Sequence, residues 1–109
     1  MICGTVTQQG FYTDNKGICE IYINRASSNK LPHQHGKKKL ISVVIGGIIY
    51  EAGVHETADG TVWLSSVLYK NDPKRTKTRL VDALAKIGVE KGNTITMEAN
   101  NDGSFTIRS

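Results

Sequence analysis

The alternation of apolar and polar residues predicts that the chain opens with two β-strands. In the segment 18–24, Cys19, Ile21 and Ile23 fall on one face and polar residues fall mainly on the other. A period of two residues is that of a strand with one buried face. The segment 4–12 has a similar β-type composition, and a turn cluster joins it to the second strand.

Turn residues separate the remaining predicted strands. The clearest turn is the Gly46-Gly47 pair, because both central positions of a tight primed turn need a positive φ, which glycine adopts without strain. Trp63 is the largest candidate for the core among these segments, although an aromatic side chain on a strand can also form part of an exposed sheet platform. The predicted strands are residues 40–45, 48–54, 61–68, 94–99 and 104–108.

An apolar repeat at helical spacing over residues 80–87 predicts the only helix, with Leu84 on its buried face. Thr76 or Thr78 is placed to cap its start, and Gly88 is placed to end it in the left-handed conformation. Six or seven strands with one helix indicate a mostly β fold. We therefore expect a single open β-barrel, or pseudobarrel, of about seven strands with one main α-helix.

Length and composition fit one domain over residues 1–109. No segment approaches the roughly 18 apolar residues of a membrane span, and the first nine residues do not resemble a signal peptide. Cys3 and Cys19 both fall in predicted strands, where we expect buried, reduced thiols. These features predict a cytoplasmic protein with no membrane partner.

The basic residues are segregated. Residues 25–39 and 70–79 hold ten of the fourteen lysines and arginines, and Asp72 is the only acid in either segment. Such a charge distribution favours a polyanionic partner. Lysine and arginine neutralise phosphates, whereas asparagine, glutamine and arginine also read base edges. The expected DNA-binding residues are Arg25, Ser27, Ser28, Asn29, Lys30, His33, Gln34, His35, Lys37, Lys38, Lys39, Lys70, Asn71, Lys74, Arg75, Lys77 and Arg79.

The absence of aromatic residues from both basic segments favours double-stranded DNA over single strands, because single-strand binders stack bases on exposed aromatic rings. Two basic loops at one end of a barrel would straddle a duplex and grip its major groove. We therefore expect sequence-specific binding of duplex DNA.

The sequence offers little for catalysis. His33, His35 and His55 would be the ligands of a small metal-dependent enzyme, which remains an alternative. The lysines at 37–39 oppose a bound cation, so we expect no metal and no cofactor. The segment 35–37 matches only a fragment of a nuclease signature, and there is no phosphate-binding glycine loop or serine nucleophile motif. We expect a binding module rather than an enzyme.

The order of features resembles a known family. A Ser-rich loop ending in Leu31-Pro32 is followed by a basic hairpin, by Trp63 on a central strand, by the helix, and by Gly92-Asn93 before a late strand. This order resembles that of the B3-like DNA-binding pseudobarrels, which include plant transcription factors and the recognition domains of restriction enzymes of the EcoRII and BfiI type. The lack of a second aromatic-rich segment points to the restriction-enzyme branch.

The resemblance implies two arms that enter the major groove, residues 25–39 and residues 65–79. It also implies either the recognition module of a restriction enzyme, with a nuclease domain or subunit as partner, or a stand-alone binder. The late strand start is similar to that of AbrB-like regulators too. An obligate AbrB-like dimer with interlocked hairpins is therefore an alternative, and the sequence leaves the oligomeric state open.

Overall fold

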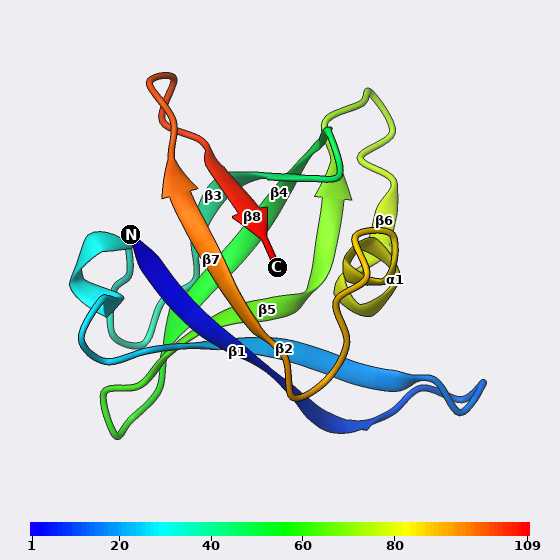
Figure 1. Cartoon of the computed structure of the whole chain (residues 1–109), viewed down its shortest axis with the longest axis horizontal. Helices are drawn as coiled ribbons and strands as arrows, with labels where there is room; N and C mark the ends of the chain where they lie inside the picture. Colours follow the sequence, from blue (N-terminus) through cyan, green and yellow to red (C-terminus); the bar gives the residue numbers. More distant parts are fainter.

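The computed structural model describes all 109 residues. The chain forms eight strands, one short α-helix and a 3₁₀ turn, which are joined by loops (Figure 1). The strands form where the alternating pattern predicts them, with one further short strand at the end of the second basic segment. The elements are β1 (Ile2–Phe11), β2 (Gly17–Ile23), η1 (Ser28–Lys30), β3 (Lys39–Ile45), β4 (Ile48–Glu56), β5 (Val62–Lys70), β6 (Lys77–Arg79), α1 (Leu80–Ala85), β7 (Thr94–Ala99) and β8 (Phe105–Arg108).

Seven strands form a closed barrel, which confirms the mostly β fold. The strand order is β2-β1-β7-β8-β3-β4-β5-β6, and a pairing of β2 with β5 closes the ring and leaves β6 outside it. All neighbours are antiparallel except β3 and β8, which run parallel. Because every strand of the ring comes from this chain, the barrel is complete within one molecule.

In β2 every second residue faces the core: Cys19, Ile21 and Ile23 are buried, as the alternating pattern predicts. Trp63, the largest candidate for the core, does not belong to it. Its neighbours Val62 and Leu64 are both fully buried, so alternation turns the indole to the outer face of β5. There it packs edge-on against Tyr22 of the adjacent strand β2, with ring centroids 5.3 Å apart. The largest fully buried side chain is instead Tyr50.

The turn predictions depend on glycine and are confirmed at two places. Gly46 and Gly47 have φ values of 59° and 80° and connect Ile45 directly to its partner Ile48. Gly88 has a φ of 73°, and its N–H donates to the carbonyl of Ala85 at 3.1 Å. Both turns need a backbone conformation that other residues rarely adopt.

The helix is shorter than the apolar repeat suggests, and its predicted cap is wrong. α1 spans six residues, begins after Arg79, and has no side-chain cap. Thr78 belongs to β6, and Thr76 bonds to Asp72 instead. Leu84 is buried as predicted, and α1 packs over β2, β5 and β6.

The two thiols differ. Cys19 is buried, and burial raises the pKa of its thiol. Cys3 is only partly buried, which corrects the expectation that both are enclosed, because it alternates with the buried residues Ile2 and Gly4. The two cysteines are not joined by a disulfide. None of the chain's helical segments has the length and apolar character needed to traverse a lipid bilayer.

The carboxylate of Asp59 holds the turn between β4 and β5. It accepts hydrogen bonds from the hydroxyls of Thr57 and Thr61 and from the N–H of Thr61, and these bonds lower the pKa of Asp59 from 3.8 to about 2. The ionised form is thus favoured in the folded state. The stability that this turn contributes is present above the ordinary pKa of an aspartate and is lost as the pH falls through about 2.

An NMR titration of Asp59 should show a midpoint near 2; an unshifted midpoint would contradict this bonding.

Candidate nucleic-acid interface

The first basic loop, residues 24–38 between β2 and β3, is fixed to the barrel at its start. Leu31 is buried in the core. The hydroxyl of Ser27 accepts the N–H of Cys3 at 3.1 Å and donates to the carbonyl of Asn24 at 3.3 Å. Ser27 is itself buried, so it supports the loop and is not available to a ligand. The hydroxyl of Ser28 likewise donates to the carbonyl of Arg25.

The second half of this loop is held by one carboxylate. The Nδ1–H of His33 donates to Glu56 Oε1 at 2.8 Å, and the Nδ1–H of His35 donates to Glu56 Oε2 at 3.2 Å. Glu56 is the last residue of β4. The third histidine, His55, lies instead beside the hydroxyl of Ser65 at 3.3 Å. The structure therefore brings His33 and His35 together around Glu56 and leaves His55 out of that cluster.

Lys38 crosses the outer face of β4 at a glycine. A Cβ atom on Gly53 would lie only 2.5 Å from Cδ of Lys38. The pairing of β4 with β5 also shifts register here: Ala52 pairs with Leu68 and Val54 with Leu64, so Gly53 lies opposite extra residues of β5, at 65–67. Gly53 thus leaves room for the aliphatic stem of Lys38 to lie on the strand, as long basic side chains often do on protein surfaces.

The second basic loop, residues 71–76 between β5 and β6, is built around Asp72. The carboxylate of Asp72 accepts the N–H of Thr76 at 3.1 Å and its hydroxyl at 3.0 Å. The carbonyl of Asp72 accepts the N–H of Arg75 at 3.0 Å, and the carbonyl of Thr76 accepts the N–H of Lys70. The Thr76 N–H above all lowers the pKa of Asp72. The one acid of the basic segments is therefore a structural residue.

Two arginines of this segment are already paired. Arg75 donates to Glu51 and lies over the ring of Tyr69. Arg79 donates to Asp14 at 2.7 Å and lies 3.9 Å from the ring centroid of Tyr12. The Asp14 hydrogen bond raises the pKa of Arg79, and Arg79 in turn lowers the pKa of Asp14. Arg79 is thereby bonded to the β1–β2 hairpin, whereas Arg75 is bonded to β4.

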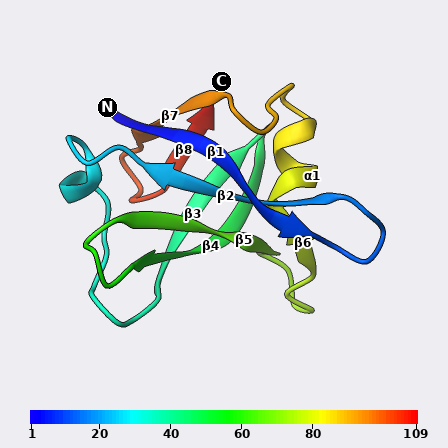
Figure 2. The same cartoon turned by 90° about the horizontal axis from the view of Figure 1, so that it is seen from below.

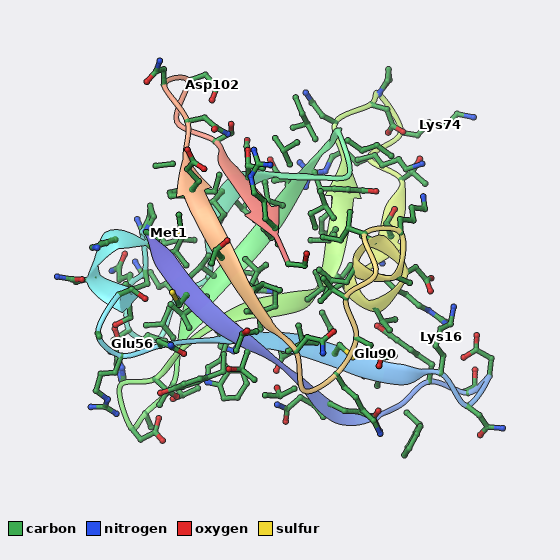
Figure 3. The ribbon with its side chains drawn as sticks, viewed as in Figure 1. Met1, Lys16, Glu56, Lys74, Glu90 and Asp102 are labelled. Carbon is green, nitrogen blue, oxygen red and sulfur yellow. The ribbon has the colours of Figure 1, made fainter.

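The two basic loops do not lie at one end of the barrel, which corrects that expectation. The strands β3 and β5 are both antiparallel to β4, so they run in the same direction. The first loop leads into the start of β3 and the second follows the end of β5, which places them at opposite ends. In Figure 1 they lie at the left edge and the upper right, and Figure 3 labels Glu56 and Lys74 at these two places.

Both loops nevertheless extend toward the same side of the molecule. Figure 2 shows them reaching the lower side of the barrel, one at each end of β4 and β5. Between them lies the β4–β5 face, which we define as the outer side of these two strands: Glu51, Gly53 and His55 of β4 with Trp63 and Tyr69 of β5. The second loop contacts this face at Glu51. The first loop contacts Glu56, the last residue of β4, beside the face. These positions are five residues apart along one strand, or about 17 Å.

The electrostatic balance of this region is positive. Of the ten lysines and arginines in the two basic segments, only Arg75 and Arg79 form ion pairs, which leaves eight cations without one. Four acids lie on or beside the β4–β5 face. Glu51 and Glu56 are bonded to basic groups, whereas Glu20 and Asp59 line a hollow together with His55 and Trp63 and form no ion pair. The unpaired cations are Arg25, Lys30, Lys37, Lys38, Lys39, Lys70, Lys74 and Lys77.

Sequence reasoning missed three residues that organise this region: Glu51, Glu56 and Tyr69. Glu51 alternates with the buried residues Tyr50 and Ala52, so its outward position is readable from the strand pattern. Its pairing with Arg75 is not readable, because it depends on the path of a loop 24 residues further along the chain.

No family model, curated protein or solved structure matches this chain. The class of this protein is therefore described by its fold and its candidate site alone. It is a small closed β-barrel with two structured basic loops that flank one face. The resemblance to B3-like domains stays a prediction.

Proposed function

We propose that this protein binds duplex DNA sequence-specifically, with its two basic loops on either side of the major groove and its β4–β5 face toward the bases. The observation that carries the proposal is the gathering of eight unpaired cations at the two ends of one face. Phosphate contacts supply most of the affinity of such interfaces and are made mainly by lysine and arginine.

The spacing of the loops supports a duplex as the ligand. The loop anchor points are about 17 Å apart along β4, and the major groove of B-DNA is about 12 Å wide. Side chains that reach inward from both loops would meet the two phosphate backbones that border the groove.

The polar side chains of the loops support sequence readout. Asn29, Gln34 and Asn71 are exposed, and their side chains form no hydrogen bond within the protein. Their amide groups are therefore free for base edges, to which asparagine and glutamine bond bidentately at adenine. Arg25, His33, Arg75 and Lys77 are the other candidates for base contact.

The proposal is for a binding module rather than an enzyme. By resemblance to the B3-like recognition domains it would serve a restriction system, with catalysis in a nuclease domain or subunit, or act alone. A barrel that closes within one chain supports this fold over the interlocked hairpins of an AbrB-like dimer.

We expect Lys38→Ala and Asn29→Ala to weaken binding in different ways. Lys38→Ala should lower the affinity for every duplex by about the same factor, because an ammonium group neutralises phosphate without reading bases. Asn29→Ala should instead remove about 1–3 kcal/mol of discrimination at one base pair. Fluorescence anisotropy on a preferred duplex selected from a random pool, its single-pair variants and a scrambled duplex separates the two effects.

The matched control is Lys86→Ala, an exposed lysine just after α1 and outside both basic segments, which should change neither quantity. If Lys38→Ala and Asn29→Ala reduce binding to all duplexes by one common factor, the first basic loop contacts only the DNA backbone. The proposal that Asn29 reads a base is then wrong.

A further inference from the structure

Arg75 has a backbone conformation that its residue type rarely adopts. Its φ is +48°, and the only other non-glycine residue with a positive φ is Asn15, whose type tolerates that region well. The bonds of Asp72 to Arg75 and Thr76 impose this geometry. Strained backbone of this kind occurs often where a side chain must be presented to a ligand.

The side chain of Arg75 is held on the β4–β5 face by two residues from different strands. Its Nη2 donates to Glu51 of β4, and its Cζ lies 4.9 Å from the ring centroid of Tyr69 on β5. Glu51 and Tyr69 are direct partners across the β4–β5 ladder. The side chain of Arg75 is nevertheless 55% exposed, so part of the guanidinium is open to a ligand.

The surroundings of Arg75 favour a base edge over a phosphate as its ligand. A guanidinium has five N–H donors, and Glu51 accepts a hydrogen bond from Nη2 of Arg75, which leaves other donors of the guanidinium for a ligand. Guanine presents two acceptors, O6 and N7, in the major groove, and a bidentate arginine is the commonest specific partner for them. The carboxylate of Glu51 repels a phosphate that approaches the same place, whereas a base edge carries no net charge.

We propose that Glu51, Tyr69 and Asp72 form a frame that presents Arg75 to a guanine, so that the recognition sequence contains a G·C pair specified by Arg75. The inference rests on the proposed DNA-binding function and adds a specificity-determining residue with its positioning residues. Glu51 lowers the affinity for DNA that lacks the guanine, because its charge opposes phosphate and its hydrogen bond restrains the guanidinium.

The test is selection from a randomised duplex pool, with sequencing of the retained fraction, for the wild type, Arg75→Ala, Arg75→Lys and Glu51→Gln. The wild type should retain one nearly invariant G·C pair. Arg75→Ala should reduce the preference for it by about 5- to 150-fold and keep the other positions. Arg75→Lys should retain only part of the preference, because an ammonium is not a planar fork.

Glu51→Gln should bind a scrambled duplex several-fold more tightly and select the G·C pair less strongly. The matched control is Glu98→Gln, an exposed acid on β7; it measures the effect of removing one negative charge elsewhere. Without DNA, the guanidinium protons of Arg75 should exchange with water faster in Glu51→Gln than in the wild type. Equal behaviour of the Glu51 and Glu98 variants in both measurements would overturn the role of Glu51.

The outcomes separate the two proposals. If the wild type retains no DNA, the proposed function fails and this inference fails with it. If DNA is retained but Arg75→Ala leaves every base preference unchanged, or weakens all duplexes equally, DNA binding stands and the guanine-reading role is overturned.

Discussion

Raising the salt concentration from about 50 to about 200 mM is expected to weaken duplex binding about a thousandfold. The eight unpaired cations of the two basic segments are enough for roughly six phosphate contacts. Each contact releases condensed counterions from the DNA, so the logarithm of the binding constant should fall with the logarithm of the salt concentration with a slope of about −5. Anisotropy titrations over a salt series measure this slope directly.

A triple variant tests whether the first basic loop supplies these contacts. Replacing Lys37, Lys38 and Lys39 by glutamine should make the slope shallower by about 3, because each lost phosphate contact removes about 0.9. Lys86→Gln, outside both segments, is the control and should keep the wild-type slope. A wild-type slope near zero would remove the electrostatic basis of the proposal, and an unchanged slope in the triple variant would place the contacts elsewhere.

Leu84→Ala is expected to lower the free energy of unfolding by about 2–5 kcal/mol. The side chain is only 1% exposed and lies where α1 covers the barrel. A six-residue helix is too short to be stable by itself, so its packing against β2, β5 and β6 decides whether it forms. Urea denaturation followed by circular dichroism measures the loss.

Tyr50→Phe is the matched control in the same core. The hydroxyl of Tyr50 is buried and has no hydrogen-bond partner, and burial raises its pKa. Its removal deletes a polar group without leaving a cavity, so the stability should be unchanged or higher. If Leu84→Ala costs less than about 0.5 kcal/mol, the packing of α1 is not as described.

Local patterns were sufficient to predict most of the fold. The alternation of residues 18–24 and the glycine pair at 46–47 depend only on neighbours in the chain, and both predictions are confirmed. The size of Trp63 suggests burial, whereas the strand period decides which face a residue occupies. The helix cap failed because Asp72 binds Thr76 within a loop whose path the sequence pattern does not reveal.

The candidate site was predictable only in part. Charge segregation identified the two basic loops, since it is a property of composition along the chain. Their placement at opposite ends of β4 follows from strand order and direction, which involve pairings far apart in the sequence. The ion pairs of Arg75 with Glu51 and of Arg79 with Asp14 likewise join residues 24 and 65 positions apart.

The central claim is that duplex DNA lies against the β4–β5 face between the two basic loops. Chemical-shift mapping of backbone amides with a 20-base-pair duplex of mixed sequence tests it most directly. We expect perturbed amides in residues 24–38, in residues 70–77 and on the β4–β5 face, with little change in α1 and in the β7–β8 hairpin. Perturbations confined to α1 or the β7–β8 hairpin, or no perturbation at low salt, would contradict the claim.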